Sequence, residues 1–137
     1  MFLSIFATGR KKKNMNYILF DDNSRIDLLP FTFTRPVCDL RAGILTIREK
    51  WEKFLGISTS TLTEEYLSKK FSLKIEKDNI FLNGKVCPDS KLLDEIKKLK
   101  TGQKLVDGKT ILATRISGEQ ISPPLITHAR SKVHCTF

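Results

Sequence analysis

Three arginines in one long loop are the residues of this chain best suited to bind an anion. Arg25, Arg35 and Arg41 lie between residues 21 and 42, a stretch interrupted by prolines, and Gly43 follows directly. Each proline disfavours helix at itself and at the residue before it, so this stretch is expected to be a loop. Arginine presents a planar fork of N–H donors that matches phosphate oxygens, and a helix that begins near Gly43 would add backbone N–H groups. Together these groups predict a site for the phosphates of a nucleoside triphosphate.

Two adjacent carboxylates, Asp21 and Asp22, open the same loop. Carboxylate oxygens are the ligands that Mg²⁺ prefers, so this pair could hold a magnesium ion beside the phosphates. The same pair is also typical of a turn that ends a strand, and any single arginine of the loop also fits a surface or loop-bracing role. Arg48 is explained by a solvated helix pair with Glu52, four residues later. The set of metal ligands therefore stays open.

Other common catalytic signatures are absent from the sequence. It contains no GxGxxG, no GxxxxGK[ST], no HExxH and no catalytic Ser/His/Asp set. The three cysteines, Cys38, Cys87 and Cys135, are widely spaced and lack a zinc-type pattern, so we interpret them as reduced and structural. From the residues alone, the prediction is an α/β anion-binding domain and no particular reaction.

The elements that would position this loop begin with a short apolar run. Tyr17–Phe20 predicts a buried strand that ends at the two aspartates. A helix is expected from near Gly43 to Gly56, because apolar residues recur at spacings of three and four and because glycine commonly ends helices. The expected apolar stripe consists of Ile44, Ile47, Trp51, Phe54 and Leu55.

The remainder of the chain alternates between strand and helix signals. The expected elements are a β-branched stretch at 57–61, a helix capped by Thr63, a strand at Asn79–Asn83 halted by Gly84, a helix capped by Asp89 and a hairpin of 104–106 with 110–116. The buried face of the helix after Asp89 is expected to carry Leu92, Leu93, Ile96 and Leu99. This alternation predicts an α/β sheet, whose ligands bind beyond the carboxyl ends of its strands.

Length and composition fit one soluble globular domain. The chain has 137 residues, of which 40% are hydrophobic and 28% charged, and this excludes collagen-like, mucin-like and composition-driven disordered proteins. No apolar run approaches the roughly 20 residues that span a bilayer, and the apolar start is too short for a signal peptide. We therefore expect a cytoplasmic protein with no membrane partner.

The net charge of +9 suggests an alternative function. Arg10–Lys13 lie within residues 1–14, a segment without acidic residues, which we interpret as a basic tail or as sequence before a true start at Met15. With the lysines at 97, 98 and 100, this run would suit a basic, non-catalytic module that binds nucleic acid or another polyanion. Aromatic and basic residues do not interleave as they do in nucleic-acid-binding surfaces, so nucleic acid is not the expected partner.

Three blocks of the sequence resemble a known enzyme family. These blocks are Tyr17–Asp22, Leu29–Pro36 and Arg41–Trp51. They are similar to the N-terminal region of sugar nucleotidyltransferases of the N-acetylglucosamine-1-phosphate uridylyltransferase type, in the branch typical of Bacteroidetes. The resemblance implies a partial Rossmann-like nucleotidyltransferase domain with a mostly parallel sheet over residues 15–137. Family members continue into a left-handed β-helix of hexapeptide repeats with an acyltransferase-like character. The chain is therefore expected to be a truncated N-terminal part that lacks the sugar pocket, and the full-length protein is expected to form a homotrimer through its β-helix.

The resemblance also implies a reaction and a site. A nucleotidyl group would pass from a nucleoside triphosphate to a sugar 1-phosphate with release of pyrophosphate and with Mg²⁺ as cofactor, as in UDP- or dTDP-sugar pyrophosphorylases. The sugar phosphate oxygen is the nucleophile, so the protein supplies positioning and charge neutralisation. The resemblance assigns catalytic roles to Arg25 and Arg35, and the expected nucleotide-binding residues are Asp22, Arg41, Gly43, Asn83 and Gly84.

The chain departs from the wider superfamily at three places. Residues 21–25 stand where a GxGTR loop is expected, and of that loop only Arg25 is retained. Val37 follows the loop proline in place of a lysine. Lys85 follows Asn83-Gly84, where a metal-binding aspartate is usual. Either another carboxylate, Asp21, Asp22 or one beyond residue 137, binds the metal, or the activity is weak.

Overall fold

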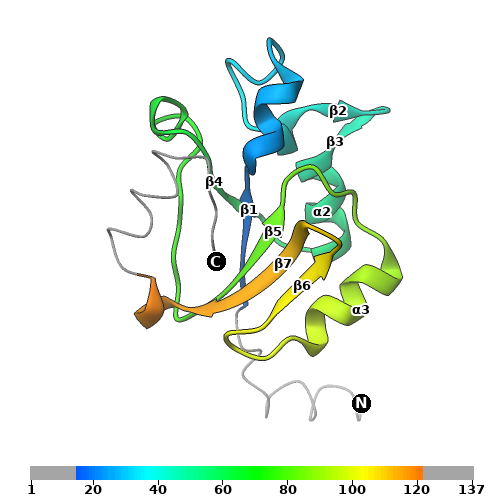
Figure 1. The fold of residues 1–137 in the computed structure, drawn as a ribbon, viewed down its shortest axis with the longest axis vertical. Coiled ribbons are helices and arrows are strands. Elements are labelled where there is room, and N and C mark those ends of the chain that lie inside the picture. The colour runs from blue at the N-terminus through cyan, green and yellow to red at the C-terminus, as the bar shows by residue number, and fades with distance from the viewer. Residues whose placement is uncertain (1–14, 122–137) are drawn as a thin grey trace, which may run out of the picture.

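The computed structural model describes residues 15–121 (Figure 1). The basic segment 1–14, Cys135 and the end of the chain lie outside the described residues. Among the helices of 15–121, none has both the length and the apolar composition that crossing a membrane requires.

A five-stranded sheet forms the centre of the fold, in the order β4-β1-β5-β7-β6. These strands are β1 (Asn16–Phe20), β4 (Ser60–Leu62), β5 (Asp78–Asn83), β6 (Lys104–Asp107) and β7 (Thr110–Ser117). β1 pairs in parallel with β4 and β5, whereas β7 is antiparallel to both β5 and β6. Of the five strands, only β7 therefore runs against the others, and the mostly parallel α/β fold class is confirmed.

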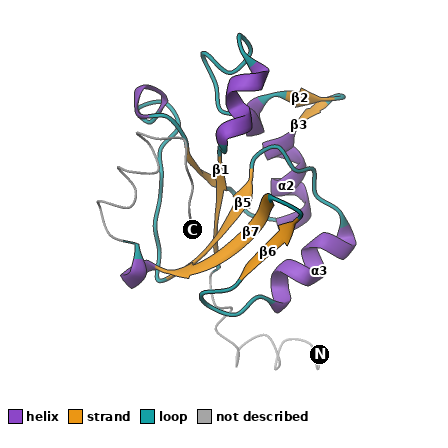
Figure 2. Cartoon of the chain, in the orientation of Figure 1, coloured by secondary structure: helices purple, strands orange, loops and turns teal. Residues whose placement is uncertain are grey.

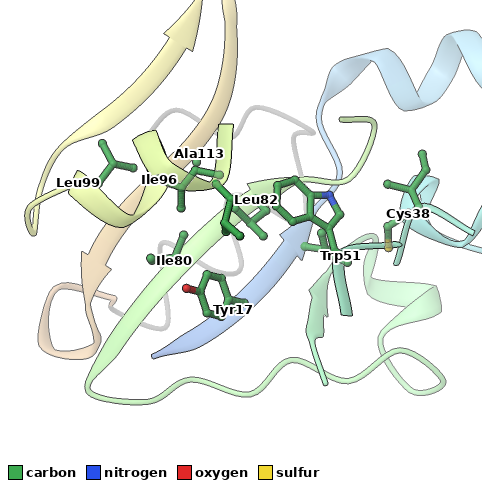
Figure 3. Close-up of a cluster of buried hydrophobic side chains, with 11 residues drawn as sticks. Tyr17, Cys38, Trp51, Ile80, Leu82, Ile96, Leu99 and Ala113 are labelled. Carbon is green, nitrogen blue, oxygen red and sulfur yellow. The ribbon is translucent and has the colours of Figure 1, made fainter. Parts of the chain in front are cut away.

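One face of this sheet packs against two helices, α2 (Ile47–Leu55) and α3 (Ser90–Lys98) (Figure 2). Alternate residues of β1 and β5 point toward the helices, as expected for strands with a period of two. Figure 3 shows Trp51 of α2 and Ile96 of α3 beside Leu82 of β5. The buried members of this cluster are Tyr17, Leu19, Cys38, Ile47, Trp51, Ile80, Leu82, Leu93, Ile96, Leu99 and Ala113.

The opposite face of the sheet carries a second apolar cluster. Its buried members are Ile18, Phe20, Leu62, Phe81 and Ile121. Leu73 and Ile75, from the segment between β4 and β5, pack against it. β1 and β5 are therefore buried on both faces, which is typical of strands in the parallel part of an α/β sheet.

The expected helix start near Gly43 is wrong. Gly43 has a φ of +87° and lies in the turn between β2 (Arg41–Ala42) and β3 (Leu45–Thr46), two short antiparallel strands. The helix begins only at Ile47, because Thr46 and Glu49 form a capping box in which each side chain bonds the backbone N–H of the other residue. Ile44 is consequently outside the buried stripe and is 87% exposed.

The other end of this helix was predicted correctly. Gly56 ends α2 in the left-handed conformation with a φ of +70°. Ile47 and Trp51 are buried as expected, whereas Phe54 is 50% exposed. The apolar stripe is therefore narrower than the sequence pattern indicated.

The expected helix after Thr63 is also wrong. The structure has strand β4 at Ser60–Leu62 and then only a short 3-10 turn, η3 (Glu65–Leu67), whose N-cap is Glu64. Thr63 is buried, and its hydroxyl donates a hydrogen bond to Asp21 instead of capping a helix. The hydroxyl of Thr63 thus bonds a residue far away in the sequence and not the first turn of a helix.

The second half of the chain agrees well with the predictions. β5 ends at Asn83, and β6 and β7 form the expected hairpin around Gly108. Asp89 is the N-cap of α3, although its side chain makes no capping hydrogen bond. Leu93, Ile96 and Leu99 are buried, and Leu92 is partly buried.

The two cysteines of the described region are free, as expected. Cys38 is fully buried, and burial raises the pKa of its thiol well above the ordinary value. A thiol of this kind is unreactive, because the thiolate is the nucleophile. Cys87 is exposed, and its interpretation as structural stays a prediction.

Substitution of Ile80, which is 1% exposed, tests the core. Ile80→Ala should lower the free energy of unfolding by about 2–5 kcal/mol, because it opens a cavity between the sheet and the helices. Ile44→Ala makes the same change at an exposed site and should cost less than about 0.5 kcal/mol. Urea denaturation followed by the fluorescence of Trp51 measures both values. Equal losses would contradict the exposed position of Ile44.

Candidate functional site

The candidate site lies where the parallel strands end. Phe20, at the end of β1, pairs with Leu62 of β4 on one side and with Asn83 of β5 on the other. Because the three strands end side by side, the residues that follow them meet at one edge of the sheet. The loop after β1 and the β2–β3 hairpin lie at this same end of the molecule (Figure 1).

Asp21 is buried at this edge and faces the interior. Its carboxylate accepts hydrogen bonds from the backbone N–H of Val37 at 2.9 Å and from the hydroxyl of Thr63 at 2.6 Å. The Nε of Arg25 lies 3.3 Å from its Oδ2. Burial raises the pKa of Asp21 above its ordinary value of 3.8, and these hydrogen bonds and the charge of Arg25 offset only part of the rise. Asp21 thus links the loop after β1 to the residue that follows β4.

Asp22 has a different environment, on the side of β5. Its Oδ1 accepts hydrogen bonds from the backbone N–H and the hydroxyl of Ser24, at 3.0 and 2.5 Å. Its Oδ2 accepts from the Nδ2 of Asn83 and lies beside the Nζ of Lys85, each at 2.9 Å. Partial burial by itself would raise the pKa of Asp22, but the bonds from Ser24, Lys85 and Asn83 outweigh it and hold the pKa below 3.8.

Gly84 brings Lys85 to this position. Its N–H donates to the carbonyl of Phe20 at 2.8 Å, so the chain after β5 lies directly against the end of β1. A Cβ on Gly84 would be 3.2 Å from that carbonyl oxygen and 3.3 Å from Cys38. A side chain at position 84 would therefore push Lys85 away from Asp22.

A cavity of about 440 Å³ opens beside this pair. It lies between the loop after β1, the β2 strand and the start of α2. We call it the edge cavity, and its lining residues are Ser24, Asp27, Leu28, Val37, Leu40, Arg41, Ile47 and Lys85. Two cations, Arg41 and Lys85, thus line a partly apolar cavity at the carboxyl edge of the sheet, which is where α/β folds bind ligands.

Arg25 does not line the edge cavity. It is buried, its Nη2 donates to the carbonyl oxygen of Thr32 and, at 2.7 Å, to the hydroxyl of Tyr66, and its guanidinium lies 5.7 Å from the centre of the Tyr66 ring. Thr32 in turn donates to the carbonyl of Arg25. These contacts match the loop-bracing role that the sequence left open for these arginines, and the catalytic role of Arg25 stays a prediction.

The other two loop arginines occupy exposed positions. Arg35 makes no hydrogen bond or ion pair with residues 15–121 and does not line the edge cavity. Arg41 lines the cavity, and its Nη1 donates to the carbonyl of Ile44 at 2.8 Å. Gly43 belongs to the turn that Arg41 spans, so it cannot act through a helix N-terminus. Of the predicted residues, Arg41 is the one that the structure places at the cavity.

Asn83 and Gly84 have structural partners at the edge. Asn83 is buried, and its Nδ2 donates to Asp22 and to the carbonyl of Ile111, each at 2.9 Å. Its Oδ1 accepts from the backbone N–H of Lys85 at 3.1 Å. These contacts bring Asp22, Asn83 and Gly84 together at the edge, where they position Lys85 and do not themselves line the cavity. Their nucleotide-binding role stays a prediction.

The expected pair of Arg48 with Glu52 is wrong. Arg48 binds Asp39, with Nε 2.6 Å from Oδ1, and donates to the hydroxyl of Thr61 at 2.5 Å. Glu52 instead accepts hydrogen bonds from the backbone and hydroxyl of Thr59. Arg48 thus joins α2 to the loop before it and to β4. The spacing of residues along one helix does not reveal contacts of this kind.

The carboxylates at the edge do not fit a resident magnesium ion. Within residues 15–121, no group of three or more His, Cys, Asp or Glu side chains is arranged to hold a metal. Asp22 already accepts from four donors, one of them the ammonium of Lys85, and Asp21 faces Arg25. The expected use of Mg²⁺ stays a prediction.

Lys85 is the site residue that sequence reasoning missed. In the sequence it stands out only as a departure from an expected metal ligand. The available signal was its position, two residues after a strand that runs parallel to β1, because this places it at the same sheet edge as the two aspartates.

The lysines in the last turn of α3 and just after it belong to a surface of mixed charge. Lys97, Lys98 and Lys100 are exposed, but the Nζ of Lys98 lies 2.8 Å from the carboxylate of Glu95. Asp94 is exposed on the same helix. The basic run at residues 10–13 lies outside the described part of the chain, so the alternative of a polyanion-binding module stays a prediction without a specific observation in its favour.

Comparison with known proteins gives one finding. A family model described as sugar nucleotidyl transferase matches residues 17–136. Searches among curated proteins and among solved structures gave no match. The family match confirms the resemblance to sugar nucleotidyltransferases, whereas the uridylyltransferase type and the branch typical of Bacteroidetes stay predictions.

Arg25 gives a test of the loop-bracing role. Arg25→Ala should lower the free energy of unfolding by about 3–5 kcal/mol, because it leaves the buried carboxylate of Asp21 without its cation. Arg35→Ala removes an exposed guanidinium from the same loop and should change it by less than about 0.5 kcal/mol. Urea denaturation of both variants makes the comparison. A fully stable Arg25→Ala variant would refute this role.

Asp22 should make stability depend on pH in the acid range. Its pKa in the folded chain lies below the ordinary value of 3.8, so ionised Asp22 stabilises the fold above pH 3.8. This contribution is lost as the pH falls through the pKa of the folded state. The stability advantage of the natural chain over Asp22→Asn should therefore shrink below about pH 4. Denaturation curves at several pH values measure it, with Asp107→Asn at the exposed end of β6 as control, and an advantage that grows in acid would contradict the lowered pKa.

Proposed function

Because the chain belongs to the sugar nucleotidyl transferase family, we propose that its edge cavity binds the phosphates of a nucleoside triphosphate whose nucleotidyl group is transferred to a sugar 1-phosphate. The observation that carries this proposal is the pair of cations, Arg41 and Lys85, in one cavity at the carboxyl edge of the parallel strands. Phosphate oxygens are the ligand groups that such cations recognise best.

The reaction requires little covalent chemistry from the protein, because the bonds form and break between the substrates. An oxygen of the sugar 1-phosphate attacks the α-phosphorus of the triphosphate, and the bond from that phosphorus to the bridging oxygen of the pyrophosphate group breaks. The leaving pyrophosphate takes the electron pair of that bond. Catalysis of this kind depends on alignment of the two phosphates and on neutralisation of their negative charge.

The residues of the edge cavity suit these two tasks. The forked guanidinium of Arg41 would hold two phosphate oxygens at once, and Lys85 would act as a point charge. Leu28, Val37 and Leu40 provide an apolar wall on part of the cavity. Low local polarity strengthens the attraction between these cations and the phosphates.

The finer expectations from the resemblance remain part of the proposal. They are UTP or dTTP as the nucleotide, a cytoplasmic location and a homotrimeric full-length protein with a hexapeptide β-helix. Release of pyrophosphate from UTP or dTTP with a panel of sugar 1-phosphates tests the reaction, in the longest natural polypeptide that contains this sequence. Release that does not require the sugar 1-phosphate would contradict transfer to a sugar.

Arg41→Ala tests the location of the nucleotide. Loss of a charge-assisted hydrogen bond to phosphate should weaken UTP binding by about 10- to 100-fold. Isothermal titration calorimetry measures the affinity, with Lys109→Ala, an exposed cation between β6 and β7, as the matched control. Arg35→Ala in the same series tests the catalytic arginine predicted from the sequence. Unchanged binding in Arg41→Ala would place the nucleotide outside the edge cavity.

A further inference from the structure

Asp22 has no open position for a divalent cation. A carboxylate offers about four lone-pair positions to donors. In Asp22 two are taken by the backbone and hydroxyl of Ser24, one by Asn83 and one by Lys85, all at 3.0 Å or less. A metal ion could bind here only by displacing one of these donors.

Lys85, by contrast, has donor capacity to spare. Its ammonium carries three N–H bonds. One is directed to the Oδ2 of Asp22 at 2.9 Å and a second to the hydroxyl oxygen of Ser24 at 3.2 Å. Within residues 15–121 the third has no hydrogen-bond acceptor. The side chain is 32% exposed and lines the edge cavity, so this donor is accessible to a ligand there.

The position of the ammonium is determined by the fold. The backbone N–H of Lys85 is held by Asn83, and Gly84 allows the close approach to β1. Asp22 and Ser24, in the loop after β1, hold its Nζ. A cation fixed from the ends of two neighbouring strands needs little reorganisation when an anion arrives, as electrostatic preorganisation requires.

We propose that the ammonium of Lys85, held on Asp22, takes the place of a protein-bound divalent metal ion, so that the edge cavity binds polyphosphate without a metal. This inference rests on the proposed function, since it names the group that contacts the phosphates of the same ligand. The ligand class is a pyrophosphate or triphosphate group, free or within a nucleotide. Asp22 acts as a positioning residue for Lys85 and does not contact the ligand.

Calorimetric titration with inorganic tripolyphosphate and with UTP, in EDTA and in Mg²⁺, tests the proposal. The natural chain should bind both ligands in EDTA, with an affinity within about 3-fold of that in Mg²⁺. Lys85→Met should weaken binding in EDTA by about 10- to 100-fold, because it removes a charge-assisted contact with phosphate. Lys109→Met, the matched change outside the cavity, should bind like the natural chain.

Two further variants keep the test informative if Lys85→Met folds poorly. Lys85→Arg retains a cation and should keep most of the affinity in EDTA. Asp22→Asn leaves the ammonium in place but loosens it, and it should weaken binding less than Lys85→Met does. Circular dichroism establishes that each variant is folded before titration.

The outcomes separate this inference from the proposed function. Binding that requires Mg²⁺ and is unaffected by Lys85→Met would overturn the role of Lys85 and leave the proposed function intact. Equal losses in Lys85→Met and Lys109→Met would also overturn it, because they would indicate attraction by net charge alone. Absence of binding in both EDTA and Mg²⁺ would instead overturn the proposed function.

Discussion

The neutralisation of two adjacent carboxylates at the end of β1 is the constraint on which the rest of this site depends. Asp21 is buried and faces Arg25 and Thr63, whereas Asp22 faces β5 and Lys85. Because successive residues of an extended chain point to opposite sides, one strand end supplies two carboxylates with different partners. Burial of such charges is costly unless each is paired and hydrogen-bonded. The long loop and the neighbouring strands are therefore joined at this point.

This arrangement separates the cations of the edge into two groups with different tasks. Arg25 has its guanidinium engaged by Asp21, Thr32 and Tyr66, so its charge stabilises the loop. Lys85 and Arg41 keep donors at the edge cavity, where a ligand can reach them. Arginine and lysine content alone does not distinguish these tasks, because burial and the identity of the partner decide whether a charge is available to a substrate.

The sheet beneath the site supports the edge through its packing. β1 and β5 are buried on both faces, between the helices on one side and the segment after β4 on the other. Strands covered in this way resist movement, since their side chains are closely packed. Gly84, whose N–H bonds the carbonyl of Phe20, connects this rigid centre to Lys85. The cation at the cavity is thus positioned by strands that are buried on both faces.

The sequence by itself determined the elements whose signals are local: the apolar strands β1 and β5, the end of α2 at Gly56, the apolar face of α3 and the β6–β7 hairpin. It also determined the family, through blocks of residues around the loop, and it contained a Thr46/Glu49 capping signal that marks the true start of α2. Only the tertiary structure decided that Arg25 is buried, that Thr63 donates a hydrogen bond to Asp21 and that Lys85 forms an ion pair with Asp22. These contacts join residues far apart in the chain, and their energies depend on burial and on geometry that neighbouring residues do not encode.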